Sequence, residues 1–215
     1  MRPLRVRAFL QTGVISDQFL PLDAILYYHI VRHKMGVQDV TKPGESTVRQ
    51  EQHITLPFKK LGKNDMWYYA CSFAQWPVHT VEDSTFYVKK LDIKYIDYVS
   101  SAPKKIDQSR GQYKSCHVNI FYRHAIYVDW YCVGEPGAIN FFLKFCTHLG
   151  KKSAQGWGSV LRWEVEEWPE DWSVNGPGGQ LMRAIPTRKE GFLYGIRPSY
   201  WNSRHIFKCR LPGAP

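Results

Sequence analysis

The chain has 215 residues, of which 15% are aromatic, and a formal net charge of +10. This length suits one domain of good size, or one domain with a large insertion, that buries its own core. The five cysteines include no CxxC pair, which argues against a disulfide framework or a zinc site and favours the reducing cytoplasm. We expect neither a signal peptide nor a membrane span, because no suitable apolar run is present.

The first 36 residues predict a strand followed by a helix. Residues 4–10 alternate between apolar and mostly basic side chains, which is typical of a half-buried strand. Residues 21–36 begin with Pro21, end in a basic last turn and stop at Gly36, which predicts a helix.

Residues 37–110 are less regular. Extended pieces are expected at 53–58, 66–73 and 85–99, with turn-like stretches between the first two. These residues therefore predict a β-rich, thumb-like insertion.

Regular patterning returns after residue 112. We expect strands at 112–122 and 126–134 with a tight turn between them, a helix at 136–150 and a strand at 159–168. Without the insertion the order is β-α-β-β-α-β, which is the ferredoxin-like pattern. The sequence therefore predicts an α+β fold: a ferredoxin-like core from residues 1–36 and 111–168, the insertion over 37–110 and a C-terminal extension over 169–215.

A glycine-rich basic loop, GKKSAQGWG at 150–158, joins the second predicted helix to the last strand. It is not a P-loop, in which the lysine follows the second glycine and a strand leads into a helix. We expect Lys151 and Lys152 to neutralise phosphates, with Ser153, Gln155 and backbone N–H groups as donors. Trp157 is expected to pack in the core rather than to stack on a base. The alternative for the lysines is a solvated helix end.

The loop and two further segments, PLDAILYYHIV at 21–31 and SRGQYKSCHV at 109–118, occur in an order that resembles the RAMP superfamily. These proteins are RNA-binding subunits of CRISPR complexes, and the branch that this chain resembles is the Cas-five-type subunit of type IV systems. The insertion lies where these subunits carry a thumb. Trp157 departs from many RAMP loops, in which phenylalanine is common.

The resemblance implies a non-catalytic subunit without a cofactor. Such a subunit caps the 5′ handle of the CRISPR RNA (crRNA). It contacts the adjacent RAMP backbone subunit and a large-subunit-like protein, with target DNA nearby and no membrane.

Two further groups supply candidate RNA contacts, and the composition supports them because a basic, aromatic-rich chain suits single-stranded nucleic acid. Each group also has a simpler interpretation, as an exposed loop or as a hairpin packed by its own aromatic rings. The first group is Lys104, Lys105, Arg110, Gln112 and Lys114. The second group is Arg49, His53 and Trp76, with Lys59, Lys60, Lys63 and Trp67 around them.

Two other functions are alternatives to a non-catalytic capping subunit. One is a RAMP-fold endoribonuclease that processes precursor crRNA, and the other is a general RNA-binding module. His29 is the obvious acid–base candidate, but no partner for it is evident, and a half-buried structural histidine is the simpler interpretation. His29 and His33 have the spacing of two metal ligands without a third, so we predict no metal. The acidic run over 164–171 is expected to be a solvated edge or a patch facing a basic partner.

Overall fold

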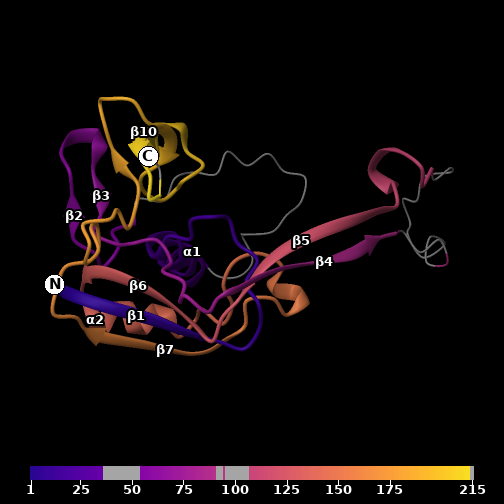
Figure 1. Cartoon of the computed structure of the whole chain (residues 1–215), viewed down its shortest axis with the longest axis horizontal. Helices are drawn as coiled ribbons and strands as arrows, with labels where there is room; N and C mark the ends of the chain where they lie inside the picture. The colour runs from indigo at the N-terminus through magenta and orange to yellow at the C-terminus, as the bar shows by residue number, and fades with distance from the viewer. Residues whose placement is uncertain (36–53, 91–93, 95–106, 214–215) are drawn as a thin grey trace.

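Strand β1 (Arg2–Leu10) is the centre of a three-stranded antiparallel sheet with the order β6-β1-β7. The structure is a computed structural model that describes residues 1–35, 54–90, 94 and 107–213. β6 (Tyr127–Gly134) and β7 (Val160–Glu167) flank β1 in Figure 1. The α+β class and these three strands are confirmed. Of the predicted contacts, Arg49, His53, Lys104 and Lys105 lie outside the described residues.

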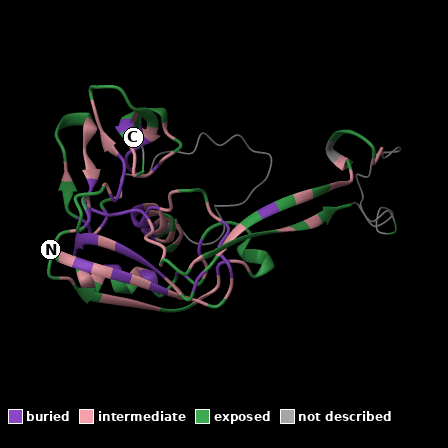
Figure 2. Ribbon diagram, in the orientation of Figure 1, coloured by how far each residue is buried: buried purple, intermediate pink, exposed green. Residues whose placement is uncertain are grey.

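Two helices pack on one face of this sheet. α1 (Leu22–Met35) and α2 (Pro136–Leu143) bury Leu26 and Ile139 in one core with Val6 of β1. The inward face of β1 is apolar at every second residue, and burial in Figure 2 alternates along the strand accordingly. α2 is shorter than the prediction of 136–150. Residues 147–149 leave the helix because they form backbone hydrogen bonds with residues 158–160 instead.

Strand β5 (Cys116–His124) pairs with β4 (Val81–Lys89) to form a long two-stranded arm that projects from the sheet (Figure 1). In the ferredoxin-like pattern, β5 would pair with β6. Here only Ala125 and Ile126 separate the two strands in sequence, yet they belong to different sheets. The corner is held by β1 and its continuation: Leu10 N–H donates to Ile126 O at 2.8 Å, and Val14 N–H donates to Arg123 O at 2.8 Å.

Residues 70–75 lie along the other edge of β6. Ser72 N–H donates to Tyr131 O at 2.8 Å, and Gln75 N–H donates to Asp129 O at 2.7 Å. The predicted extended piece at 66–73 contains the short strand β3 (Tyr68–Tyr69) and isolated backbone bridges, and the piece at 53–58 contains a bridge at Phe58. The predicted piece at 85–99 overlaps β4 at residues 85–89, and β2 (Lys60–Leu61) lies in a stretch that was expected to be a turn. Leu56, Phe58, Tyr69 and Cys71 are all buried in the main core. This part of the predicted insertion therefore packs with the core, while the predicted domain boundaries stay a prediction.

The C-terminal extension forms a second small sheet with its own core. Its strands are β8 (Ile185–Pro186), β9 (Phe192–Gly195) and β10 (Ile206–Arg210), in the order β8-β10-β9. Ala184, Ile196 and Cys209 pack there against Phe73, which comes from the segment beside β6. The extension is thus continuous with the rest of the molecule.

A buried ion pair joins the extension to the first turn of α1. Arg183 is 1% exposed, and its Nη2 lies 3.8 Å from Oδ2 of the fully buried Asp23. Arg183 also donates to the carbonyls of Cys71 and Ile196, both at 2.8 Å, and to that of Tyr69. One guanidinium therefore links α1, the segment beside β6 and the C-terminal sheet.

Asp23 has a second partner from the extension. The Tyr200 hydroxyl donates to Asp23 Oδ1 at 2.8 Å, and Ala24 N–H donates to the same oxygen at 3.0 Å. Burial raises the pKa of the Asp23 carboxyl, and burial together with the Asp23 charge raises the pKa of Tyr200. Tyr200 therefore stays protonated and remains a donor at neutral pH.

Arg183→Met is expected to lower the free energy of unfolding by about 3–5 kcal/mol, because it leaves a buried carboxyl and several carbonyls unpaired. Urea denaturation measures the loss. The control is Arg210→Met at the exposed end of β10, for which we expect a change within about 0.5 kcal/mol. Equal effects of the two substitutions would contradict the proposed linking role of Arg183.

Candidate nucleic-acid interface

Residues 150–158, here called the G-loop, form the tip of a hairpin whose two sides are residues 147–149 and 158–160. Leu149 N–H donates to Gly158 O at 2.8 Å. The loop is also tied to the segment after β1: Lys151 N–H donates to Ile15 O at 2.7 Å, and Gly158 N–H donates to Gly13 O at 2.8 Å. The backbone N–H groups of Lys151, Gln155, Gly156 and Gly158 thus donate within the protein, and we do not assign them to a ligand.

Two glycines are required where the G-loop meets its neighbours. Gly150 has a φ of +75°, and a Cβ there would lie 2.1 Å from Ile15 O. Gly158 has a φ of +70°, and a Cβ there would lie 1.9 Å from Leu149 O. The glycines of the sequence motif therefore serve the close approach of two backbones.

The lysines of the G-loop are exposed and lightly held. Lys151 Nζ lies 2.7 Å from Asp17 Oδ1, and both side chains are more than half exposed. Lys152 Nζ lies 3.1 Å from the Tyr87 hydroxyl and 4.7 Å from the centre of its ring. An exposed ion pair contributes about 0–1 kcal/mol, so a phosphate can replace Asp17 at little cost. Ser153 and Gln155 lie in a short 3₁₀ turn and are exposed.

The G-loop lies beside the base of the β4-β5 arm. Val14 and Arg123 form a pair of backbone hydrogen bonds, and Ile15 bridges to Lys151, so residues 14–15 lie between β5 and the G-loop. Trp157 is partly buried with its ring 4.8 Å from that of Tyr122, so it packs against the arm. The sequence did not indicate this contact between the G-loop and the arm.

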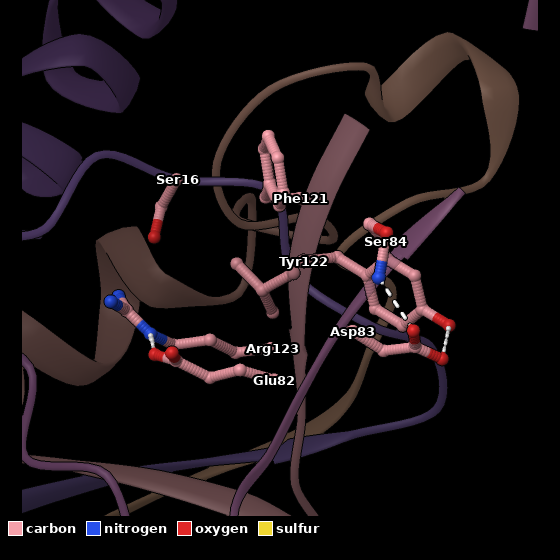
Figure 3. Close-up of a pocket in the computed structure, with 8 residues that line it drawn as sticks. Ser16, Glu82, Asp83, Ser84, Phe121, Tyr122 and Arg123 are labelled. Atoms are coloured by element: carbon pink, nitrogen blue, oxygen red, sulfur yellow. Dashed lines mark hydrogen bonds and ion pairs between the residues drawn. The ribbon is translucent and has the colours of Figure 1, made fainter. Parts of the chain in front are cut away.

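A cleft of about 440 Å³ opens at this base, beside residues 14–16 (Figure 3). Its walls include Ser16, Phe121 and Arg123, none of which the sequence analysis singled out. The alternating pattern of residues 116–124 marks a strand with an exposed face. The strand that pairs with β5 comes from residues 81–89, and no local sequence pattern identifies a pairing over that distance.

The second predicted basic group lies elsewhere. Arg110, Gln112 and Lys114 precede β5 at the far end of the arm from the G-loop (Figure 1). Arg110 is exposed, and its Nε lies 2.8 Å from Asp107 Oδ2. The structure does not bring these residues together with Lys151, so their role in RNA binding remains a prediction.

The predicted tryptophans pack within the protein. Trp76 is partly buried against the main core, and the Arg123 guanidinium lies 5.6 Å from the centre of its ring. The centre of the Trp67 ring lies 4.4 Å from Lys60 Nζ and 4.6 Å from the Arg197 guanidinium carbon. Lys59 and Lys63 are exposed near it.

The acidic run of β7 pairs with β1 across the sheet. Glu166 lies 2.6 Å from Arg5, and Glu167 pairs with Arg2. Arg7 instead donates two hydrogen bonds of 2.7 Å to Asp129 on β6. The outer face of the sheet therefore neutralises most of its own charge and offers less attraction to phosphates than the G-loop.

His29 is partly buried on α1, and its ring lies edge-on to Tyr28. Burial, with a smaller contribution from Arg32, lowers the pKa of His29 to about 4. Within the described residues, no group of three His, Cys, Asp or Glu side chains is arranged to hold a metal ion. Neither described helix is long and apolar enough to cross a bilayer.

Fold and site together define an α+β protein in which a lysine-bearing glycine loop is held against a long β-arm. The family model described as CRISPR type IV associated protein Csf3 matches residues 2–212. The chain belongs to this family, and the predicted relation to a type IV CRISPR subunit is confirmed. A comparison with curated proteins finds no match.

Gly150→Ala is expected to destabilise the protein more than Gly156→Ala. Both residues have a positive φ, which costs a non-glycine residue about 1–2 kcal/mol, but a Cβ at Gly156 meets nothing within 4 Å. The clash with Ile15 O adds a further cost of about 1–3 kcal/mol at Gly150 alone. Thermal unfolding of the two variants measures the difference, and equal losses would show that the close contact at Gly150 is unimportant.

His29→Gln is expected to make stability less sensitive to acid. The unfolded chain protonates this histidine near its ordinary pKa of about 6.5, whereas the folded protein holds the imidazole neutral down to about pH 4. The wild type therefore loses stability from this group as the pH falls through that window. Urea denaturation at several pH values measures the difference between variant and wild type. A difference that is independent of pH would contradict the assigned pKa.

Proposed function

We propose that this chain is the non-catalytic subunit of a type IV CRISPR effector complex that binds and caps the 5′ handle of the crRNA. It would contact the adjacent RAMP backbone subunit and a large-subunit-like protein. The observation that carries the proposal is the G-loop, whose backbone is fixed at Gly150 and Gly158 while Lys151 and Lys152 remain exposed. A fixed backbone places the two charges without a large ordering cost when RNA binds.

The arrangement of the sheet supports a ferredoxin-like RAMP core. The order β7-β1-β6, with both helices on one face, corresponds to the fourth, first and third strands of that pattern. Residues 70–75 then take the place beside β6 that the second strand has in the pattern. Under this proposal, β5 leaves the sheet and pairs with β4, and the arm that these two strands form serves as the thumb.

The binding chemistry that we propose is mainly electrostatic. Two exposed lysines contact phosphates, and Ser153 and Gln155 beside them add neutral donors. Such contacts position the backbone of the RNA and do not read its bases. The proposal assigns no catalytic residue, and the packing of His29 against Tyr28 supports a structural role for that histidine.

The double substitution Lys151→Ala with Lys152→Ala is expected to weaken binding of a crRNA that carries its 5′ handle. The plot of log affinity against log salt should flatten by up to about two counterions, because two phosphate contacts are lost. Fluorescence anisotropy over a range of salt concentrations measures both effects.

The matched control is Arg188→Ala with Lys189→Ala, which removes the same charge from an exposed site in the C-terminal extension. It should leave the slope near that of the wild type. An RNA without the 5′ handle should bind the wild type more weakly. An unchanged slope in the G-loop variant would remove the G-loop from the interface, and equal affinity for the two RNAs would contradict capping.

A further inference from the structure

The base of the arm carries a cleft whose chemistry differs from that of the G-loop. We infer that it holds a single unpaired nucleobase of the bound RNA, with Phe121 as the stacking surface and Ser16 and Arg123 as hydrogen-bonding groups. This inference rests on the proposed function, because the RNA that the G-loop grips is the source of the base.

Phe121 provides the flat surface. It lies on β5 opposite Ser84, and its side chain is 73% exposed, although a phenylalanine gains by burial. Figure 3 shows its ring standing above the strand beside Ser16. An exposed aromatic ring next to a basic loop is a common arrangement for stacking a base.

Ser16 provides a polar group that the protein itself does not satisfy. Its Oγ is buried, and among the described residues it has no hydrogen-bond partner. An unsatisfied buried hydroxyl costs about 1–3 kcal/mol, so such groups are rare and call for an explanation. In Figure 3, the Ser16 hydroxyl and the Arg123 guanidinium point into the same space on one side of Phe121. A base edge that enters this space reaches the Arg123 guanidinium directly, and it reaches the Ser16 hydroxyl once that side chain rotates out of its buried position.

Arg123 is held in place and still has donors to offer. Its Nε donates to Glu82 Oε1 at 2.8 Å, and the guanidinium lies over Trp76. A guanidinium carries five N–H groups, and this bond uses one of them. The orientation of Arg123 is therefore fixed before a ligand arrives, which lowers the ordering cost of binding.

The charges around the cleft favour a neutral base over a phosphate. Glu82 and Asp83 both line it, against the single positive charge of Arg123. Asp83 accepts hydrogen bonds from the Tyr122 hydroxyl and from Ser84 N–H, so it is held at the wall. A phosphate beside Phe121 would meet a guanidinium whose charge Glu82 already balances, whereas exposed lysines lie nearby in the G-loop.

The two sites lie next to each other on opposite faces of the base of the arm. Side chains alternate along β5, so Phe121 and Arg123 share one face, while the G-loop contacts the other face through Tyr122. β5 pairs with Val14, and the adjacent Ile15 pairs with Lys151. Neighbouring strands lie about 4.8 Å apart, so the backbones of β5 and the G-loop are about 10 Å apart. Because this separation is short, one RNA strand that passes the edge of the sheet at the G-loop can place a phosphate on the lysines and a nearby base in the cleft.

The test compares an oligouridylate of about ten nucleotides with an abasic ribose-phosphate oligomer of the same length and charge, both added to the full chain. The wild type should favour the base-bearing oligomer by at least about fivefold. Phe121→Ser should bring this ratio close to one while the salt slope stays unchanged. Phe192→Ser, which replaces a 58% exposed phenylalanine of the C-terminal sheet, is the matched control and should keep the wild-type ratio.

Ser16→Ala supplies a second readout. It should reduce the ratio without lowering the thermal stability of the free protein, because the hydroxyl that it removes is unpaired. A purely structural serine would give the opposite pattern, with lost stability and an unchanged ratio. An unchanged ratio in both variants would overturn the inference.

The failure of the cleft can be told apart from the failure of the proposed function. A normal effect of the G-loop variant on the salt slope, with no effect of Phe121→Ser on the ratio, overturns only the cleft. A wild type that binds neither oligomer and no crRNA overturns both.

Discussion

The guanidinium of Arg183 holds together three parts of the chain that are distant in sequence. It contacts the carboxyl of Asp23 at the start of α1, the backbone carbonyls of Tyr69 and Cys71, and the carbonyl of Ile196, directly after β9 of the C-terminal sheet. Burying a charge is costly unless its partners are all in place, so these parts must assemble together. Residues 70–75, which lie along the edge of β6, are held in place by these contacts of Arg183. The corner at Ala125 and Ile126, where the arm leaves the sheet, directly precedes β6.

The candidate site depends on a second constraint of the same kind, in which two backbones approach without side chains between them. Gly150 lets the G-loop approach Ile15, Gly158 lets the two sides of the hairpin approach each other, and Val14 in turn pairs with β5. The Thr12 hydroxyl adds to this by donating to Gly156 O at 2.8 Å and accepting from Ser159 N–H at 2.9 Å. The lysines, the arm and the cleft are thus held next to one another, although their residues come from four regions of the sequence.

The sequence was informative where the pattern is local. The alternation of residues 4–10 and the boundaries of residues 21–36 predicted β1 and α1, and the motif at 150–158 indicated the G-loop. Pairing across long separations was not predictable: the partner of β5 lies at 81–89, and the edge of β6 is taken by 70–75. The sequence did not indicate the cleft residues for the same reason: no local motif marks Ser16, Phe121 or Arg123 within its own segment. Nothing in the sequence around Arg183 indicates that this arginine is buried.

The short connection between β5 and β6 gives the arm a mechanical property. Ala125 is buried and Ile126 accepts a hydrogen bond from Leu10, so the two residues form a stiff corner rather than a flexible loop. A force on the far end of the arm therefore acts as a torque on β6, whose opposite edge carries residues 70–75 and, through Arg183, the C-terminal sheet.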